Sequence, residues 1–142
     1  MASDKLQRFK VLLGVFLGCS LSILLGGCTW SGDVSKTIVQ YENPQLYTRE
    51  EIEDAMDVVY DIFTSEYQYK DCIMTCVRYD EELSQNWSGT LSRKAIALVT
   101  TFDIGDHPAR ERIGNKKAEC LWVLQLDEDT GKWQLYSRGE EG

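Results

Sequence analysis

The chain has 142 residues, of which 43% are hydrophobic, with five cysteines and one histidine, and its formal net charge is −8 at pH 7. A surface that binds nucleic acid or anionic lipid through charge needs the opposite sign, so the composition argues against both as partners. About 100 residues remain beyond an N-terminal leader and tether, which is enough for one domain with a modest core.

The N-terminal segment has the pattern of a bacterial lipoprotein signal peptide. Lys5, Arg8 and Lys10 precede an uncharged run from Val11 to Leu25, as a basic n-region precedes an apolar h-region. As a helix this run would span only ~22 Å, which is short of a ~30 Å hydrocarbon core. The run ends in LGGC, which resembles the lipobox in which Cys28 receives a diacylglyceryl group and the chain is cleaved just before it. The alternative is an uncleaved membrane anchor.

The lipobox divides the chain into a signal peptide at 1–27, a lipidated tether at 28–46 and a domain at 47–142. Without residues 1–27 the chain carries 12 basic and 22 acidic side chains, a net charge of −10. Lipid on Cys28 would hold this part on the extracytoplasmic face of the cell membrane. The stretch TWSGDVSKTIVQYENPQ contains glycine, proline and polar residues without a clear period, which predicts a flexible tether.

The strongest helix signal lies in YTREEIEDAMDVVYDIFTSEY. Four apolar residues in it are spaced four, three and four positions apart, namely Ile52, Met56, Val59 and Phe63. This spacing predicts one buried helical face. Thr48 followed by Glu51 has the pattern of a capping box. The acidic residues of the first turns are favoured there by the helix dipole, so we interpret them as structural and not as metal ligands.

Four strands are predicted after the helix. CIMTCVRY has a period of two, with Cys72, Met74 and Cys76 expected to face one way and Val77 and Tyr79 the other. DEELSQNWSGTLSR is interpreted as a polar connection. KAIALVTTFDI, AECLWVLQLDED and KWQLYSR are the next strands, the last two forming a hairpin around DEDTG. One amphipathic helix followed by about four antiparallel strands predicts an α+β domain, in which the helix packs on one face of the sheet.

The candidate zinc ligands are Cys72, Cys76, Cys120 and His107. Positions four apart in a strand are separated by ~13 Å, whereas two thiolates on one zinc lie within ~4.6 Å of each other. We therefore expect neither a metal nor a cofactor. The same distance excludes a disulfide between Cys72 and Cys76, but leaves open one from Cys120 to either of them across neighbouring strands.

No catalytic constellation is recognisable in the sequence. His107 would have to serve any Cys–His nucleophile pair, but it lies in the polar loop GDHPAR, where a solvated residue is the favoured interpretation. Neither a phosphate-binding glycine loop nor a serine elbow is present. If the sheet curves around a cavity, the side chains of a possible pocket are Trp122, Tyr136, Tyr79 and Asp103. The alternative is that the aromatic rings fill the core.

The order of these segments resembles small uncharacterised lipoproteins of Gram-positive bacteria, over about residues 46–139. The residues that carry the resemblance are Cys72, Phe102, Trp122, Trp133 and Gly139, within a W-x-L…acidic/glycine turn…W pattern. Leu126 departs from that pattern, since arginine is common there, and so does Glu140, where an aromatic residue often follows the last glycine. The resemblance implies a nuclear-transport-factor-2-like or cystatin-like domain, with a helix held by a curved antiparallel sheet. It implies no reaction, because the family has no established activity.

Three hypotheses of function follow from the sequence. The leading one is a lipid-anchored extracytoplasmic binding or interaction module without catalysis, whose partner is a protein or a small molecule. The alternative is a small hydrolase or isomerase with a cone-shaped pocket, in which Asp103 or His107 is the acid–base residue. The third is an envelope accessory protein with a structural role.

Overall fold

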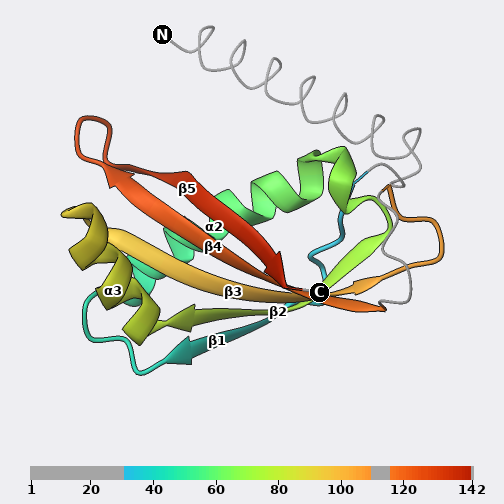
Figure 1. Cartoon of the computed structure of the whole chain (residues 1–142), viewed down its shortest axis with the longest axis horizontal. Helices are drawn as coiled ribbons and strands as arrows, with labels where there is room; N and C mark the ends of the chain where they lie inside the picture. Colours follow the sequence, from blue (N-terminus) through green and yellow to red (C-terminus); the bar gives the residue numbers. More distant parts are fainter. Residues whose placement is uncertain (1–30, 110–115, 142) are drawn as a thin grey trace, which may run out of the picture.

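The computed structural model describes residues 31–109 and 116–141 (Figure 1). The signal peptide, the lipobox and Cys28 lie outside the described residues, so their assignment stays a prediction. Within the two described ranges, none of the helices has the length and apolar character needed to cross a membrane.

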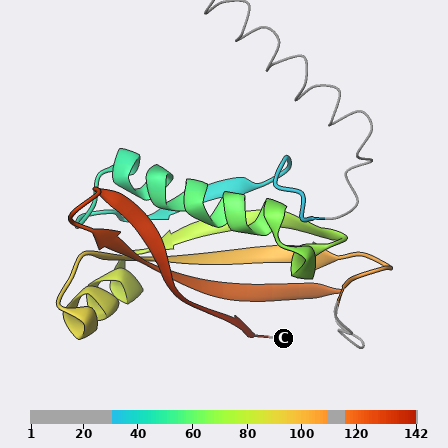
Figure 2. The same ribbon diagram turned by 90° about the horizontal axis from the view of Figure 1, so that it is seen from above.

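A single five-stranded sheet forms the centre of the domain, with the strand order β1-β2-β3-β4-β5. The long helix α2 runs along one face of the sheet, and the shorter helix α3 lies at one end of it (Figures 1 and 2). The elements are β1 (Ile38–Glu42), α2 (Arg49–Ser65), the 3-10 turn η1 (Tyr67–Tyr69), β2 (Cys72–Asp80), α3 (Glu81–Leu91), β3 (Ala95–Ile104), β4 (Lys117–Asp127) and β5 (Lys132–Glu141).

The predicted fold class is wrong, because the sheet is neither four-stranded nor wholly antiparallel and a second helix is present. β1 pairs with β2 in parallel, whereas the other neighbouring strands are antiparallel. A parallel pair needs a crossover connection, and α2 supplies it between β1 and β2. Residues 38–42, which the sequence placed in a flexible tether, therefore form a strand of the sheet.

The residues before β1 are also bound to the domain. The Gly32 N–H donates to the Phe63 carbonyl at 3.0 Å, and the Asp33 N–H donates to the Cys72 carbonyl at 2.9 Å. Met74 in turn donates its N–H to the Asp33 carbonyl at 2.8 Å. A Cβ at Gly32 would lie 2.2 Å from the Phe63 ring, so only glycine allows this close approach. The chain is therefore held against the domain from Gly32 onward.

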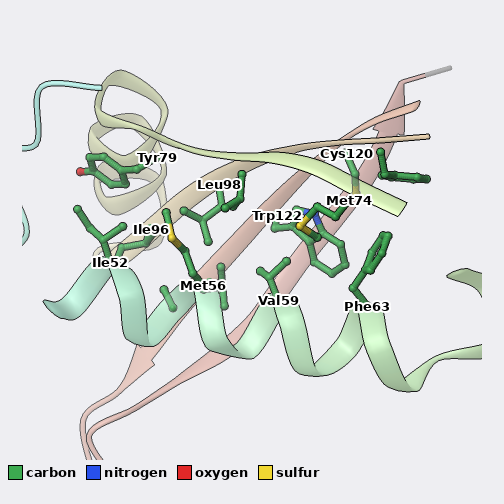
Figure 3. Close-up of a cluster of buried hydrophobic side chains, with 14 of the residues drawn as sticks. Ile52, Met56, Val59, Phe63, Met74, Tyr79, Ile96, Leu98, Cys120 and Trp122 are labelled. Carbon is green, nitrogen blue, oxygen red and sulfur yellow. The ribbon is translucent and has the colours of Figure 1, made fainter. Parts of the chain in front are cut away.

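α2 begins and packs as its apolar spacing predicts. The Glu51 N–H donates to the Thr48 side-chain oxygen at 3.2 Å, which confirms the N-cap. The buried residues of the helix are Ile52, Ala55, Met56, Val59 and Phe63. Figure 3 shows the four larger side chains of this set directed at the side chains of the sheet, among them Met74, Leu98 and Trp122. Each large apolar side chain buried in this way contributes ~1.5–3 kcal/mol.

A β-bulge in β2 changes which of its residues face the core. The pairing with β3 shifts register between Met74 and Cys76. The predicted alternation is correct as far as Met74, but beyond the bulge the buried residues are Val77 and Tyr79, while Cys76 is only half-buried. The prediction that Cys76 shares the face of Cys72 and Met74 is therefore wrong. A bulge inserts one extra residue and so reverses the phase of the following strand.

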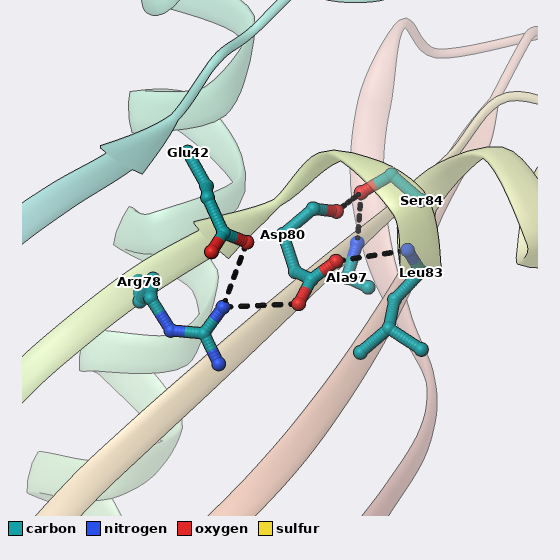
Figure 4. A network of polar contacts seen from close by, with 6 residues as sticks. All are labelled: Glu42, Arg78, Asp80, Leu83, Ser84 and Ala97. Carbon is teal, nitrogen blue, oxygen red and sulfur yellow. Dashed lines mark hydrogen bonds and ion pairs between the residues drawn. The ribbon is translucent and has the colours of Figure 1, made fainter.

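The segment interpreted as a polar connection is the helix α3. The Leu83 N–H donates to the Asp80 carboxylate at 2.9 Å, so Asp80 is the N-cap. The Ser84 hydroxyl donates to the Asp80 carbonyl at 2.6 Å and accepts from the Ala97 N–H at 2.9 Å (Figure 4). One turn later, the Ser88 hydroxyl donates to the Ala95 carbonyl at 3.0 Å. The pairing of β3 with β2 ends at Leu98. The serine hydroxyls of α3 thus supply hydrogen-bond partners to the backbone of β3 before that point.

Candidate functional site

Two of the four predicted pocket residues lie in the core under α2. Tyr79 and Trp122 flank Leu98 in one row across β2, β3 and β4, and both rings are fully buried. The Trp122 indole N–H donates to the Thr100 hydroxyl at 2.8 Å, and the Tyr79 hydroxyl donates to the Glu81 carboxylate. Burial, aided by the Glu81 carboxylate, raises the pKa of the Tyr79 hydroxyl, so it stays neutral. These rings fill the space that a cone-shaped pocket would need.

Asp103 lies on the other face of the sheet. Its neighbours Phe102 and Ile104 point into the core, so alternation along β3 directs Asp103 away from it. Its partners across the sheet are Ile73 and Lys117. The Oδ1 atom of Asp103 is buried and has no hydrogen-bond partner among the described residues. The hydrolase or isomerase hypothesis requires an acid–base residue that points into an aromatic interior. Asp103 does not point there.

Tyr136, the fourth predicted pocket residue, is on the surface. Its side chain on β5 is 49% exposed, and its ring centroid lies 6.0 Å from that of Trp87 on α3. The structure thus brings Tyr79 and Trp122 together in the core and places Asp103 and Tyr136 elsewhere.

The cysteines do not form the cross-strand disulfide that the sequence left open. Cys72 and Cys76 lie on β2 and Cys120 lies on β4, with β3 between them. Two strand spacings amount to ~10 Å, whereas a disulfide needs Cα atoms within ~7 Å. Burial raises the pKa of the Cys76 thiol, which disfavours a reactive thiolate. Within residues 31–109 and 116–141, no three or more histidine, cysteine, aspartate or glutamate side chains gather as metal ligands would.

One recess lies where the chain enters the domain, and we call it the N-terminal recess. Its volume is about 440 Å³, and its lining residues are Ser31, Asp33, Lys70, Asp71, Cys72, Ile73 and His107. Asp71 has a left-handed backbone, with φ of 59°. Its carboxylate accepts from the His107 N–H at 2.8 Å, and its carbonyl accepts from the Gly105 N–H at 2.8 Å. A Cβ at Gly105 would lie 2.2 Å from the Asp71 carboxylate, so Asp71 has a structural role that joins two loops.

The N-terminal recess also brings His107 near Cys72, the pair that nucleophilic catalysis would need. The Cys72 thiol donates to the Lys70 carbonyl at 3.6 Å, and Cys72 is buried. The His107 side chain is exposed, and its backbone makes the contact with Asp71. No hydrogen bond joins the thiol to the imidazole, both of which belong to the described part of the chain. Cys72 and His107 are therefore not arranged as an activated nucleophile and its base in the described part of the chain.

A second recess, the hairpin recess, lies between the end of α3 and the β4–β5 turn. Its volume is about 450 Å³, and its lining residues are Ser92, Arg93, Gln125, Leu126, Asp127, Glu128, Asp129 and Gln134. Gln125 and Gln134 are directly paired across β4 and β5. The Gln134 amide donates to the Asp127 carboxylate at 3.3 Å. Side-chain amides, carboxylates and a guanidinium thus converge on one concave surface.

Two aromatic rings, the exposed Tyr136 and the half-buried Trp87, extend the hairpin recess along the same face of the sheet. Trp133 and Leu135 pack on the core, so alternation along β5 places Gln134 and Tyr136 on the opposite face. The ring of Tyr136 meets that of Trp87 there. We call the hairpin recess together with this aromatic pair the hairpin site. Sequence reasoning missed it, although the polar residues of KWQLYSR alternate in the way that a strand with one solvated face requires.

Comparison with known proteins adds no function. No protein-family model matches the chain, and neither a curated protein nor a solved structure shows significant similarity to it. The resemblance to small lipoproteins of Gram-positive bacteria stays a prediction. The function is therefore inferred from the residues themselves.

Proposed function

We propose that the chain is a lipid-anchored extracytoplasmic binding module that acts through the hairpin site, without catalysis. The observation that carries the proposal is the convergence at this site of polar side chains with the exposed ring of Tyr136 and the half-buried ring of Trp87. Binding sites characteristically combine an apolar surface with a few convergent polar groups. The lipobox supports the location of the domain at the extracytoplasmic face of the membrane.

The chemistry of the hairpin site fits a hydroxyl-rich ligand. The amides of Gln125 and Gln134 can each donate and accept, while the carboxylate of Asp127 accepts and the guanidinium of Arg93 donates. The rings of Trp87 and Tyr136 offer an apolar surface with polar edges, against which the C–H face of a sugar ring can pack. A glycan presents both surfaces at once, so we assign the ligand to this class.

The test is a thermal melt of the full chain with soluble glycan fragments released from bacterial cell walls by muramidase. A ligand that binds only the folded state stabilises it by about 2.7 kcal/mol at one hundred times its Kd, which raises the Tm by several degrees. Trp87→Ala and Gln134→Ala should each reduce this shift. The matched control is Gln40→Ala, which alters an exposed glutamine on β1 outside the site.

Two outcomes would contradict the proposal in different ways. An unchanged Tm at saturating fragment concentrations would exclude the glycan class. Intact-mass spectrometry of membrane-extracted protein tests the anchor separately, and the expected mass is that of residues 28–142 with diacylglyceryl on Cys28. The mass of the whole unmodified chain would exclude the lipobox assignment.

A further inference from the structure

The described residues at the end of the domain where the chain enters form one surface, which we call the N-terminal face. It consists of residues 31–33, 67–73, 105–109 and 116–117, and it includes the N-terminal recess. We propose that this face is seated directly on the outer surface of the lipid bilayer. The inference rests on the proposed lipid anchor at Cys28.

The first argument is the length of chain between the anchor and the domain. Cys28 and Ser31 are three residues apart, a distance of at most ~11 Å when fully extended. From Gly32 the chain is bound, because Gly32 and Asp33 donate to the carbonyls of Phe63 and Cys72. A tether of residues 28–46 would have let the domain move freely, but most of that stretch belongs to the fold. The lipid must therefore enter the bilayer close to the N-terminal face.

The second argument is the side chains that this face exposes. Tyr67 is 54% exposed and Ile73 is 38% exposed, and Ile73 lies beside Asp33, where the chain joins the sheet. The Lys70 ammonium lies 5.8 Å from the centroid of the Tyr67 ring. Tyrosine with a neighbouring lysine suits the boundary between acyl chains and headgroups, because the ring has an apolar body and the ammonium reaches the phosphates.

The third argument is that charge is distributed unevenly over the domain, which the net charge of the chain does not reveal. Within the ranges of the N-terminal face three lysines balance three aspartates, namely Lys70, Lys116 and Lys117 against Asp33, Asp71 and Asp106, and Asp103 adds one carboxylate between Ile73 and Lys117. At the opposite end of the sheet, residues 42–54, 80–94 and 127–132 carry eleven carboxylates and four basic side chains. The ten residues of β3 separate the two ends by ~33 Å, several times the Debye length of ~8 Å. Most of the net negative charge of the described residues therefore lies at the end away from the membrane.

This orientation determines where the hairpin site is presented. Figures 1 and 2 place α3 and the β4–β5 turn at one end of the molecule, and the end of α2 and the β3–β4 connection at the other. With the N-terminal face on the bilayer, the hairpin site projects away from the membrane. The hairpin site could then bind its ligand while the N-terminal face stays on the bilayer.

Photocrosslinking of the full lipidated chain in native membranes tests the orientation. Benzoylphenylalanine replaces Tyr67 in one variant and Tyr136 in the other, two tyrosines of similar exposure at different ends. Lipid adducts are then counted by mass spectrometry. We expect the Tyr67 variant to yield several-fold more adduct than the Tyr136 variant, and equal yields would overturn the proposal.

A linker insertion tests whether the short connection seats the domain. A glycine–serine linker of about 30 residues between positions 30 and 31 has an r.m.s. span of ~30 Å, enough to free the domain from the surface. The adduct yield at position 67 should then fall to that at position 136, and an unchanged yield would overturn the role of the connection. An unmodified Cys28 in the membrane-extracted protein would contradict the proposed lipid anchor. A lipidated Cys28 with equal adduct yields would contradict only the proposed orientation of the domain.

Discussion

The helices α2 and α3 both pack against the sheet, but they are held there by different interactions. α2 buries five apolar residues, from Ile52 to Phe63, against the core. Ser84 is the one fully buried residue of α3, and the hydroxyls of Ser84 and Ser88 form hydrogen bonds with β3. The apolar stripe of α2 is a periodicity that can be read from the sequence, whereas the serine hydroxyls that join α3 to β3 leave no such pattern. The two helices therefore differ in the interactions that hold them and in how they should respond to substitution.

The largest effect is expected for the apolar face of α2. Phe63 stacks on Tyr69 with ring centroids 4.6 Å apart and meets Phe102 at 5.4 Å. Phe63→Ala leaves a cavity among these rings, so we expect a loss of ~3–5 kcal/mol in the free energy of unfolding. Urea denaturation measures it, with Asp61→Ala on the exposed face of α2 as control, expected within ~0.5 kcal/mol of the parent. If Phe63→Ala lowered the free energy of unfolding by less than Ser84→Ala does, the apolar face of α2 would not be the stronger of the two helix contacts.

The serine contact of α3 should give the next largest effect. Ser84→Ala removes the acceptor of the buried Ala97 N–H and should cost ~1–3 kcal/mol, because an unpaired buried donor keeps its full desolvation penalty. The neighbouring variant Gln85→Ala changes an exposed residue of the same helix and serves as control. Equal unfolding midpoints for the two variants would show that the hydroxyl contact does not hold α3.

The N-cap residues, Thr48 of α2 and Asp80 of α3, allow the stability contribution of the same position to be compared in the two helices. Thr48→Ala and Asp80→Ala each remove a side-chain acceptor, at a cost of ~1 kcal/mol. Asp80 also forms an ion pair with Arg78 at 2.9 Å, which adds ~0–1 kcal/mol (Figure 4). We expect Asp80→Ala to be the more destabilising, with Asp80→Asn between it and the parent because the amide oxygen can still cap the helix. A lower urea midpoint for Thr48→Ala than for Asp80→Ala would contradict this expectation.

The smallest effect is electrostatic, at the C-terminal end of α2. Glu66 accepts hydrogen bonds from Arg138 at 2.7 Å and from Gln68. Burial of the Glu66 carboxyl acts to raise its pKa, but these hydrogen bonds outweigh it and leave the pKa below its ordinary value of 4.5. A carboxyl with a lowered folded-state pKa stabilises the fold above its unfolded pKa, and this stability is lost as the pH falls through the folded value.

The measurement is the unfolding free energy of the parent and of Glu66→Gln from pH 7 to pH 3. The parent should be the more stable at pH 7, and the difference should shrink as the pH falls below 4.5. Glu128→Gln, which alters an exposed carboxyl in the β4–β5 turn, is the control. A difference that is constant with pH would show that Arg138 does not hold the charged form of Glu66.

Part of the candidate site could have been predicted from the sequence. α3 has an N-cap at Asp80, two glutamates in its first turn, and apolar residues at Leu83, Trp87 and Leu91, spaced four apart. These signals predict a helix, and a helix at this position would have placed Trp87 beside the last strands. The hairpin recess could not be found in this way, because its residues come from separate segments that meet only in the folded sheet.

Features that depend on local chemistry can be predicted from the order of the residues. The α2 stripe, the Thr48 cap and the positions of the last four strands follow from periodicity and capping, and the structure confirms them. The tertiary structure alone decided what depends on pairing between distant segments. β1 became a strand because β2 offers it a parallel edge, and the bulge after Met74 set the phase of Tyr79. Backbone hydrogen bonds between strands decided these features, and they leave no pattern in the sequence because nearly every residue carries the same N–H and C=O groups.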